Sequence, residues 1–377
     1  MTSKQKRTSK LLLLLLCLLI VFLLSLSIGY ANTSFIKVLQ VFLGQADTTM
    51  SLIVFKIRLP RILACMLGGA SLAMSGVLLQ TLTKNPLADS GILGINAGAG
   101  LIIAVMVGLL DITNLAILTL MPFFVMLGSF LTISIVYAVS HRKNQPIQPT
   151  RLIISGVGIS SLLSGVMVSV IANLDIGKTD YVVSWLSGKV SGGNWQLLAI
   201  MAPLLGIIWG MTIWRSYCLN MMMFSQETSI ALGLNLKKER LWVLTLSTFL
   251  AAFSVLLVGN ITFVGLLSGH ITRRLFGNDH RIVLPASMLI GMILMLIADT
   301  IGRSLLVGTG IPTGLIISVI GAPYFLYLMI KSPPAKGSPQ RKHCPRRQGS
   351  QQPAHRSGSP SECPPRGSCR RRAGTLR

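Results

Sequence analysis

Hydrophobic residues gather along the chain in long blocks that short polar segments separate. Most blocks hold about twenty residues, the length that an α-helix needs to cross the hydrocarbon core of a bilayer. We therefore predict an all-α, polytopic membrane protein with about ten transmembrane helices, near residues 11–28, 61–82, 92–110, 115–140, 152–172, 195–214, 241–258, 260–275, 284–303 and 312–330.

Composition supports this prediction and divides the chain into two regions. The chain is 51% hydrophobic and 12% charged, whereas soluble domains carry about 25% charged residues. We predict a transmembrane domain over 1–330 and a disordered tail over 331–377, because the tail holds twelve Lys or Arg, eight prolines and a single acidic residue. The tail is either a basic arm that binds nucleic acid or acidic lipid or an appended, non-native sequence. Its abrupt composition favours the second, and we expect no nucleic-acid partner.

The first hydrophobic block follows a basic flank, residues 1–10, and has two interpretations. It is either a secretory signal peptide or an uncleaved first span whose flank stays in the cytoplasm. Its eighteen apolar residues are long for a signal peptide, which favours the uncleaved span. With that flank inside, the predicted cytoplasmic loops carry more Lys and Arg than the external ones, as the positive-inside rule requires. An even number of spans then leaves both termini in the cytoplasm.

Motifs for enzymatic or ion-coupled chemistry are missing from the sequence. It has no G-x-x-x-x-G-K-[ST] phosphate loop, no H-E-x-x-H pair and no Ser/His/Asp constellation. We therefore predict no catalytic residue, no bound cofactor and no metal site. Ion-coupled carriers usually keep ionisable groups in the interior of their spans. Here only Asp299 lies near the interior of a predicted span, so the sequence gives little support to an ion-coupled carrier.

Polar segments at the ends of the spans each allow a structural and a functional interpretation. The segment 58–61 places two arginines at an external boundary, where they either extend to the interface or bind carboxylates of a docking partner. In the segment 224–235, Ser225 can cap a short helix and Gly233 can end it. That helix either lies idle on the membrane or occupies a groove of a partner.

These segments, together with motifs of small residues, resemble the permease family of ABC importers for iron–siderophores, haem and cobalamin. The resemblance covers about residues 50–330 and is carried by Arg58-Leu59-Pro60-Arg61, Gly68-Gly69-Ala70-Ser71-Leu72-Ala73, Ser75-Gly76, Gln80, Asn85-Pro86-Leu87-Ala88, Leu93-Gly94, Gly98-Ala99, Ala231-Leu232-Gly233, Phe263-Val264-Gly265-Leu266, Gly277, Asp279-His280-Arg281, Ala298-Asp299, Arg303 and Gly321-Ala322-Pro323. One departure is Ser268-Gly269, since the family usually has Pro before the histidine that follows.

The resemblance implies the type II architecture of ABC importer permeases in a bacterial cytoplasmic membrane. It implies three protein partners: a second permease subunit, a cytoplasmic ATPase dimer that uses ATP and Mg²⁺, and an external substrate-binding protein. The residues implied to receive the binding protein are Arg58, Arg61 and Arg303. Those implied to couple to the ATPase, within a loop at about 222–238, are Ser225, Glu227, Ala231, Leu232 and Gly233. The structural or gating motifs are Gln80, Asn85, Pro86, Gly265, His270 and Asp299.

We therefore expect the permease subunit of a binding-protein-dependent ABC importer that takes up ferric siderophores by ATP-driven alternating access. A haem or cobalamin permease is the alternative within the family. An ion-coupled secondary carrier is the alternative from another class. The sequence does not distinguish a homodimer from a heterodimer.

Overall fold

The computed structural model describes residues 3–28, 35–45, 47–110, 115–141, 148–190, 194–305 and 311–331. The regular secondary structure of these residues is entirely helical, which confirms the all-α prediction. The helices are α1 (Ser3–Ser27), α2 (Phe35–Phe42), α3 (Thr48–Leu52), the π-helix η1 (Ile53–Arg58), α4 (Leu59–Thr83), α5 (Ile95–Leu109), α6 (Leu115–Ser140), α7 (Pro149–Ile171), α8 (Ile176–Leu186), α9 (Trp195–Trp214), α10 (Ser216–Met222), α11 (Gln226–Ala231), α12 (Leu236–Val258), α13 (Val264–Phe276), α14 (His280–Leu305) and α15 (Thr313–Lys331).

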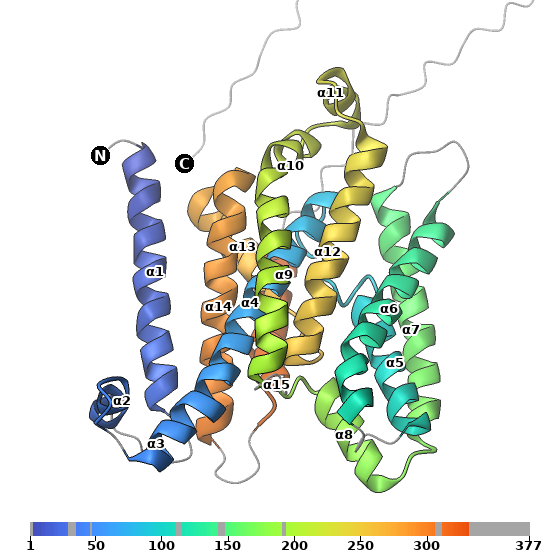
Figure 1. Ribbon diagram of the computed structural model, residues 1–377. Helices are drawn as coiled ribbons and strands as arrows, with labels where there is room; N and C mark the ends of the chain where they lie inside the picture. Colours follow the sequence, from blue (N-terminus) through green and yellow to red (C-terminus); the bar gives the residue numbers. More distant parts are fainter. Residues whose placement is uncertain are drawn as a thin grey trace, which may run out of the picture. The chain divides into compact units, whose positions relative to one another are not determined.

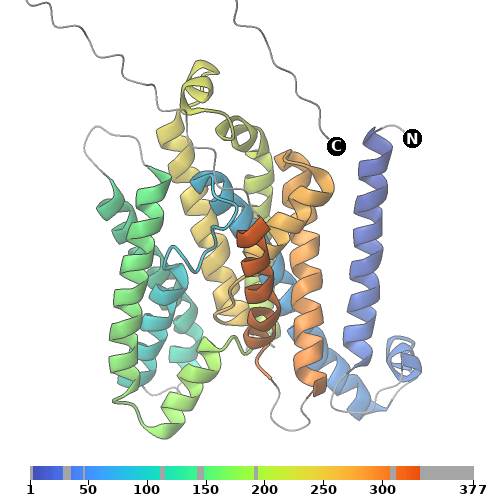
Figure 2. The ribbon, with the colours of Figure 1, turned by 180° about the vertical axis from the view of Figure 1, so that it is seen from behind.

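The long helices of this domain run side by side between two ends (Figures 1 and 2). The short helices α2, α3 and α8 lie at one end, which we call the α3 end. The short helices α10 and α11 lie at the other, which we call the α11 end. The predicted tail beyond residue 331 lies outside the described residues.

Among the described residues, seven helical stretches are long and apolar enough to cross a membrane: Arg7–Ser27, Thr48–Thr83, Phe123–Ser140, Thr150–Ile171, Trp195–Trp214, Leu236–Val258 and His280–Ser304. The chain is therefore a multi-pass membrane protein. Each of the other three predicted spans overlaps a shorter helix: α5 has 15 residues, α13 has 13, and the apolar part of α15 is Thr313–Leu328.

Two of these short helices, α5 and α13, begin later in the sequence than predicted, because an irregular, non-helical segment precedes each of them. We call these two segments the breaks before α5 and α13. Residues 84–94 turn back into the domain, and Gly94 adopts a φ of +78° just before α5. Phe263 has a φ of +69° just before α13, a conformation that costs a non-glycine residue roughly 1–2 kcal/mol. Its N–H donates to the buried side chain of Asp89, Oδ2, at 3.1 Å. The predicted spans 92–110 and 260–275 thus start a few residues too early.

Pro60 lies in the first turn of α4, but helical backbone already precedes α4. α3, η1 and α4 form one continuous stretch, Thr48–Thr83, of 36 residues. Because Pro60 has no N–H to donate to the carbonyl four residues earlier, the wider π-helical turn of η1 precedes it.

Helix α4 is the centre of the domain. Twenty of its 25 residues are buried, and it packs against α12, α13 and α14. A Cβ added to Gly69 would lie 2.5 Å from the Gly291 carbonyl oxygen in α14, and one added to Gly76 would lie 2.4 Å from the Gly265 Cα in α13. The backbones therefore touch, as is usual where small residues mediate helix packing in membranes.

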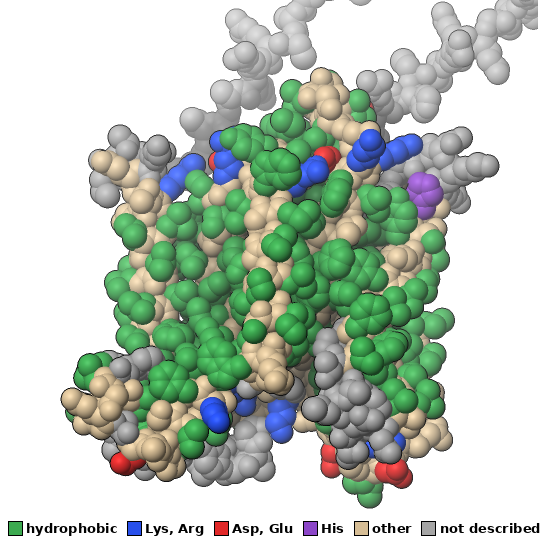
Figure 3. Space-filling model, viewed as in Figure 1, with side chains coloured by type: hydrophobic (Ala, Val, Ile, Leu, Met, Phe, Trp, Pro, Cys, Tyr) green, Lys and Arg blue, Asp and Glu red, His purple; other side chains and the backbone are tan. Residues whose placement is uncertain are grey.

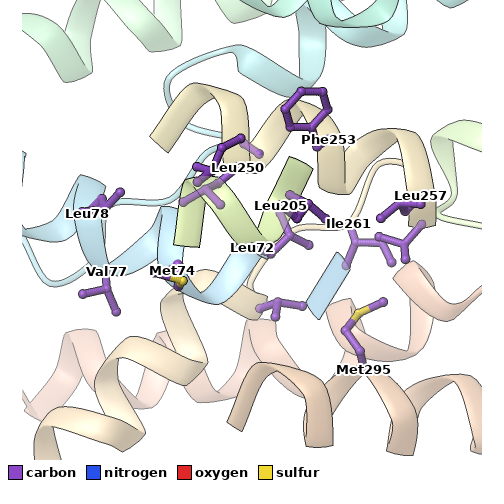
Figure 4. Packing of buried hydrophobic residues seen from close by; sticks show 14 of the residues in the cluster. Leu72, Met74, Val77, Leu78, Leu205, Leu250, Phe253, Leu257, Ile261 and Met295 are labelled. Atoms are coloured by element: carbon purple, nitrogen blue, oxygen red, sulfur yellow. The ribbon is translucent and has the colours of Figure 1, made fainter. Parts of the chain in front are cut away.

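Hydroxyl groups and apolar side chains complete these contacts. Ser254 of α12 donates to the Gly68 carbonyl at 2.8 Å, and Ser75 of α4 donates to the Ser247 carbonyl at 2.8 Å. Figure 4 shows buried hydrophobic residues from α4, α9, α12 and α14 in one cluster, including Leu72, Leu78, Leu205, Leu250, Leu257 and Met295.

Outer helices expose apolar side chains instead of burying them. In the most apolar 18-residue stretch of α7, only 11% of the residues are buried, and in that of α1 only 17%. Figure 3 shows hydrophobic side chains covering the middle of one face, with a row of Lys and Arg at the α11 end. This distribution is typical of a surface that contacts lipid.

We expect Gly76→Ala to destabilise the domain by about 1–3 kcal/mol, because the new methyl group would overlap the α13 backbone. Gly206→Ala is the matched control, since Gly206 is an exposed helical glycine of α9 with nothing within 4 Å of an added Cβ. Thermal midpoints measured by size-exclusion chromatography of detergent-purified protein check this. Equal midpoints for the two variants would contradict the α4–α13 contact.

Candidate functional site

The three arginines expected to receive a docking partner lie together at the α3 end. Arg58 is buried, and its Nη1 donates to the Leu26 carbonyl at 2.7 Å. Arg61 donates through Nε and Nη2 to Asp299 Oδ1, at 2.9 and 2.8 Å. Arg303 donates through Nε to Asp299 Oδ2 at 2.9 Å. We call Arg58, Arg61, Arg303 and Asp299 the arginine cluster.

Asp299 holds this cluster together. Its side chain is fully buried, and Thr313 Oγ1 also donates to its Oδ1, at 3.2 Å. A buried carboxylate requires such partners, because its removal from water costs several kcal/mol. One carboxylate does not neutralise three guanidiniums, so the cluster keeps a positive charge. Arg61 and Arg303, whose side chains are 28% and 14% exposed, present that charge to solvent.

The segment expected to contact an ATPase lies at the other end and contains α11. The predicted short helix is confirmed: the Ser225 Oγ accepts from the backbone N–H of Thr228 at 3.2 Å as its N-cap. Gly233 follows its end with a φ of +85°, which favours glycine.

The surface of α11 is largely uncovered. The apolar side chains of Ile230 and Leu232 are 61% and 55% exposed. Glu227 and Ala231 are exposed beside them. The described residues therefore leave a short apolar face with one carboxylate open at this end.

Two charged groups lie at the α11 end, Lys84 just before α11 and Asp279 beside α10. Lys84 ends α4 and donates to the Phe224 carbonyl, just before α11. Burial lowers the pKa of Lys84, and the neighbouring cation Arg240 lowers it further. Asp279 accepts from Asn220 Nδ2 at 2.8 Å, and this bond lowers the pKa of the Asp279 carboxyl. Asp279 is therefore ionised at neutral pH.

The residues expected to be structural or gating motifs do not form one site. Gln80 lies between α4 and α13, where a Cβ on Gly269 would be 2.6 Å from its Oε1. Asn85 Oδ1 accepts from the Leu87 N–H at 2.9 Å and so fixes the turn that contains Pro86. The others are placed as follows: Gly265 against Gly76, His270 with its ring 5.8 Å from that of Tyr324 in α15, and Asp299 in the arginine cluster.

Sequence reasoning missed two buried polar groups. Asp89 was not among the predicted site residues, but residues 84–94 fold back into the domain and bury it. Asp299 is therefore not the only carboxylate inside the domain. His280 was noted only within a motif, and it is fully buried with its ring against Thr81 of α4. The motif Asn85-Pro86-Leu87-Ala88, which directly precedes Asp89, was the available signal for that residue.

The arginine cluster and α11 lie far apart. Arg58 precedes α4 and Lys84 follows it, and 25 helical residues at about 1.5 Å each span about 37 Å. This length exceeds the hydrocarbon core of a bilayer, about 30 Å. The two expected contact regions can therefore face opposite sides of one membrane.

Comparison with known proteins then identifies the family. The FecCD transport family matches residues 17–331 of the chain. The chain belongs to the FecCD transport family. This confirms its resemblance to permease subunits of iron–siderophore and haem importers.

Relatives of the chain match over most of their length. The iron(3+)-hydroxamate import system permease protein FhuG of Bacillus subtilis is 35% identical over 317 residues, which cover 83% of this chain and 94% of FhuG. The hemin transport system permease protein HmuU of Yersinia pestis is 31% identical over 320 residues, 83% of this chain and 94% of HmuU. A solved ABC transporter chain in an inward-facing conformation is 29% identical with a TM-score of 0.73, covering 86% of this chain and 100% of that one.

We expect Asp299→Asn to lower the free energy of unfolding by about 3 kcal/mol, because it leaves Arg61 and Arg303 without their shared counter-charge. Asp175→Asn is the control, since Asp175 is an exposed acidic residue before α8 that makes no side-chain cap bond. Thermal midpoints of both variants in detergent test this. A midpoint for Asp299→Asn equal to that of the control would show that the cluster does not stabilise the fold.

Proposed function

We propose that the chain is the permease subunit of a binding-protein-dependent ABC importer that takes up ferric siderophores. The observation that carries this proposal is the FecCD family match over residues 17–331. Relatives named for iron(3+)-hydroxamate and Fe(3+)-citrate import, 35% and 36% identical, support an iron chelate as the cargo. The relative named for hemin transport, 31% identical, makes haem the alternative.

The proposed topology has ten crossings, with both termini and α11 in the cytoplasm of a bacterial cell. The seven long apolar helices supply most crossings, and α5, α13 and α15 complete them together with the turns that precede them. The row of Lys and Arg at the α11 end in Figure 3 supports this orientation.

The proposed contact with the ATPase is made by α11. Its exposed Ile230 and Leu232 suit a hydrophobic groove on a partner, and Glu227 can bind a cation at the rim. ATP and Mg²⁺ are used by that partner, and this chain supplies no nucleotide site. Closure of the ATPase dimer displaces α11, which shifts the helices between outward-open and inward-open arrangements.

The proposed contact with the substrate-binding protein is made by the arginine cluster. Arg61 and Arg303 are partly exposed and already oriented by Asp299. Acidic residues of a partner can pair with the N–H groups of Arg61 that Asp299 does not use, whereas Arg303 also donates through Nη2 to Ser25 Oγ at 2.8 Å and adds mainly its charge. Arg58 is buried against α1 and acts through the positive potential that it adds. The second permease subunit completes the pathway.

Reconstitution in proteoliposomes tests the proposed function. With ATPase and binding-protein partners, the chain should import iron-loaded hydroxamate siderophore only when ATP is supplied, and haemin and ferric citrate serve as the competing cargoes. Transport by the chain alone, driven by an ion gradient, would instead identify a secondary carrier. Uptake of haemin but not of the siderophore would identify haem as the cargo.

Arg61→Gln should weaken binding of the substrate-binding protein about tenfold or more, because glutamine keeps a donor for Asp299 but loses the charge. Lys56→Gln is the matched control, since Lys56 is an exposed cation of η1 close in sequence. Dissociation constants measured on nanodisc-embedded complexes check this. If both variants weaken binding equally, the substrate-binding protein is held by nonspecific electrostatic attraction and not by docking at the arginine cluster.

A further inference from the structure

The short helix α10 is fastened to the first turn of α14 by side-chain contacts. Asn220 Nδ2 donates to Asp279 Oδ1 at 2.8 Å, and Asn220 Oδ1 accepts from the His280 backbone N–H at 2.9 Å. The Arg281 guanidinium lies over the Tyr217 ring, with Cζ 3.5 Å from the ring centroid. A shift of α10 along α14 would break all of these contacts.

His280 continues this connection from α14 to the central helix α4. Its Nδ1 lies 2.7 Å from Asn220 Oδ1, and its Nε2 lies 2.7 Å from Thr81 Oγ1. Arg273 of α13 donates through Nη2 to the same Thr81 oxygen at 3.1 Å. Side chains from α4, α10, α13 and α14 therefore meet around one buried imidazole ring.

The direction of these hydrogen bonds follows from the chemistry of each group. Asn220 Oδ1 faces a backbone N–H and its amide nitrogen faces a carboxylate, so its orientation is fixed and His280 Nδ1 must donate to it. Arg273 only donates, so the Thr81 oxygen accepts from it. Burial beside the Arg273 cation favours a neutral ring, whose Nε2 can accept from the Thr81 hydroxyl. The single proton of that hydroxyl has a second acceptor in the Val77 carbonyl, at 2.8 Å. The bonds then run from Arg273 through Thr81, His280 and Asn220 to Asp279.

The proposed ATPase contact, α11, is hydrogen-bonded to α10, which carries Asn220, and the segment just before it to the end of α4, which carries Thr81. Ser229 of α11 donates through Oγ to the Met221 carbonyl of α10 at 2.8 Å. Lys84, at the end of α4, donates to the Phe224 carbonyl between α10 and α11. A displacement of α11 therefore reaches α4 by two routes, one directly through Lys84 and one through α10 and His280.

Among the described residues, several neighbouring polar groups between α4 and α13 form no hydrogen bond that joins the helices. Both side-chain polar atoms of Gln80, the Thr272 hydroxyl and Arg273 Nη1 are buried without a hydrogen-bond partner among the described residues. In this part of α4, the Thr81 hydroxyl carries the polar attachment to α13 and α14.

We propose that Thr81, His280 and Asn220 are positioning residues that transmit the displacement of α11 to α4. This inference rests on the proposed contact of α11 with an ATPase. The covalent chain already passes a displacement of α11 to α12, which follows it. The chain of hydrogen bonds passes it to α4, whose other end holds Arg61 in the arginine cluster.

Two threonines on the same turns of α4 provide a matched test. The Thr81 and Thr83 hydroxyls are both buried, and each lies near a carbonyl four residues earlier in the helix, at 2.8 and 2.7 Å. Only Thr81 also contacts His280 and Arg273. Thr81→Val removes the tie, Thr81→Ser keeps the hydroxyl, and Thr83→Val is the control.

The complete importer is reconstituted in proteoliposomes, and uptake of iron-loaded hydroxamate siderophore and ATP hydrolysis are measured in the same vesicles. We expect Thr81→Val to lower the siderophore taken up per ATP hydrolysed about fivefold or more while hydrolysis continues. Thr81→Ser and Thr83→Val should keep the wild-type ratio. A lower ratio in Thr81→Val alone supports the transmission role.

Equal ratios for Thr81→Val and Thr83→Val, with an active wild type, would overturn this inference alone. A wild-type importer that takes up none of the cargoes would overturn the proposed function and this inference with it. If Thr81→Val does not assemble, Asn220→Asp replaces it, since it keeps the side-chain shape at a half-buried position but opposes Asp279 with a second carboxylate. An unchanged ratio in Asn220→Asp would also overturn the inference.

Discussion

The antiparallel contact between α4 and α14 is the constraint on which both ends of the domain depend. Near the middle, the backbones touch where Gly69 meets Gly291. Eight residues from these glycines on each helix, Arg61 meets Asp299, and toward the other end Thr81 meets the first residue of α14. Both helices rise about 1.5 Å per residue, so these contacts share one register. Sliding one helix along the other would break all of them together.

The non-helical segments before α5 and α13 stabilise each other through hydrogen bonds. Backbone groups that leave a helix inside a membrane domain need partners from the protein, because lipid offers none. The carboxylate of Asp89, from the first break, accepts the Phe263 N–H of the second. Asn96, in the first turn of α5, donates through Nδ2 to Asn260 Oδ1 at 2.8 Å. Each break therefore supplies polar groups that the other needs, and two short helices form where two uninterrupted spans were expected.

Local chemistry in the sequence predicted the local features of the structure. Hydrophobic blocks located the long helices, and Ser225 with Gly233 located both ends of α11, since capping depends on neighbouring residues alone. Pairings between distant residues were not predictable in this way. Arg61 and Asp299 were both noted, but their bond joins residues 238 positions apart and depends on the packing of α4 against α14. The burial of Asp89 likewise depends on a fold that a hydrophobicity pattern does not contain.

Asp299 links any partner at the α3 end to the central helix pair. Under the proposed docking role, a carboxylate that approaches Arg61 or Arg303 competes with Asp299 for the same guanidinium groups. Asp299 is fully buried and cannot turn to water in compensation. A partner that draws these arginines outward therefore acts directly on the α4–α14 contact. Because the register of that pair extends to Thr81, binding at one end and displacement of α11 at the other act on the same two helices.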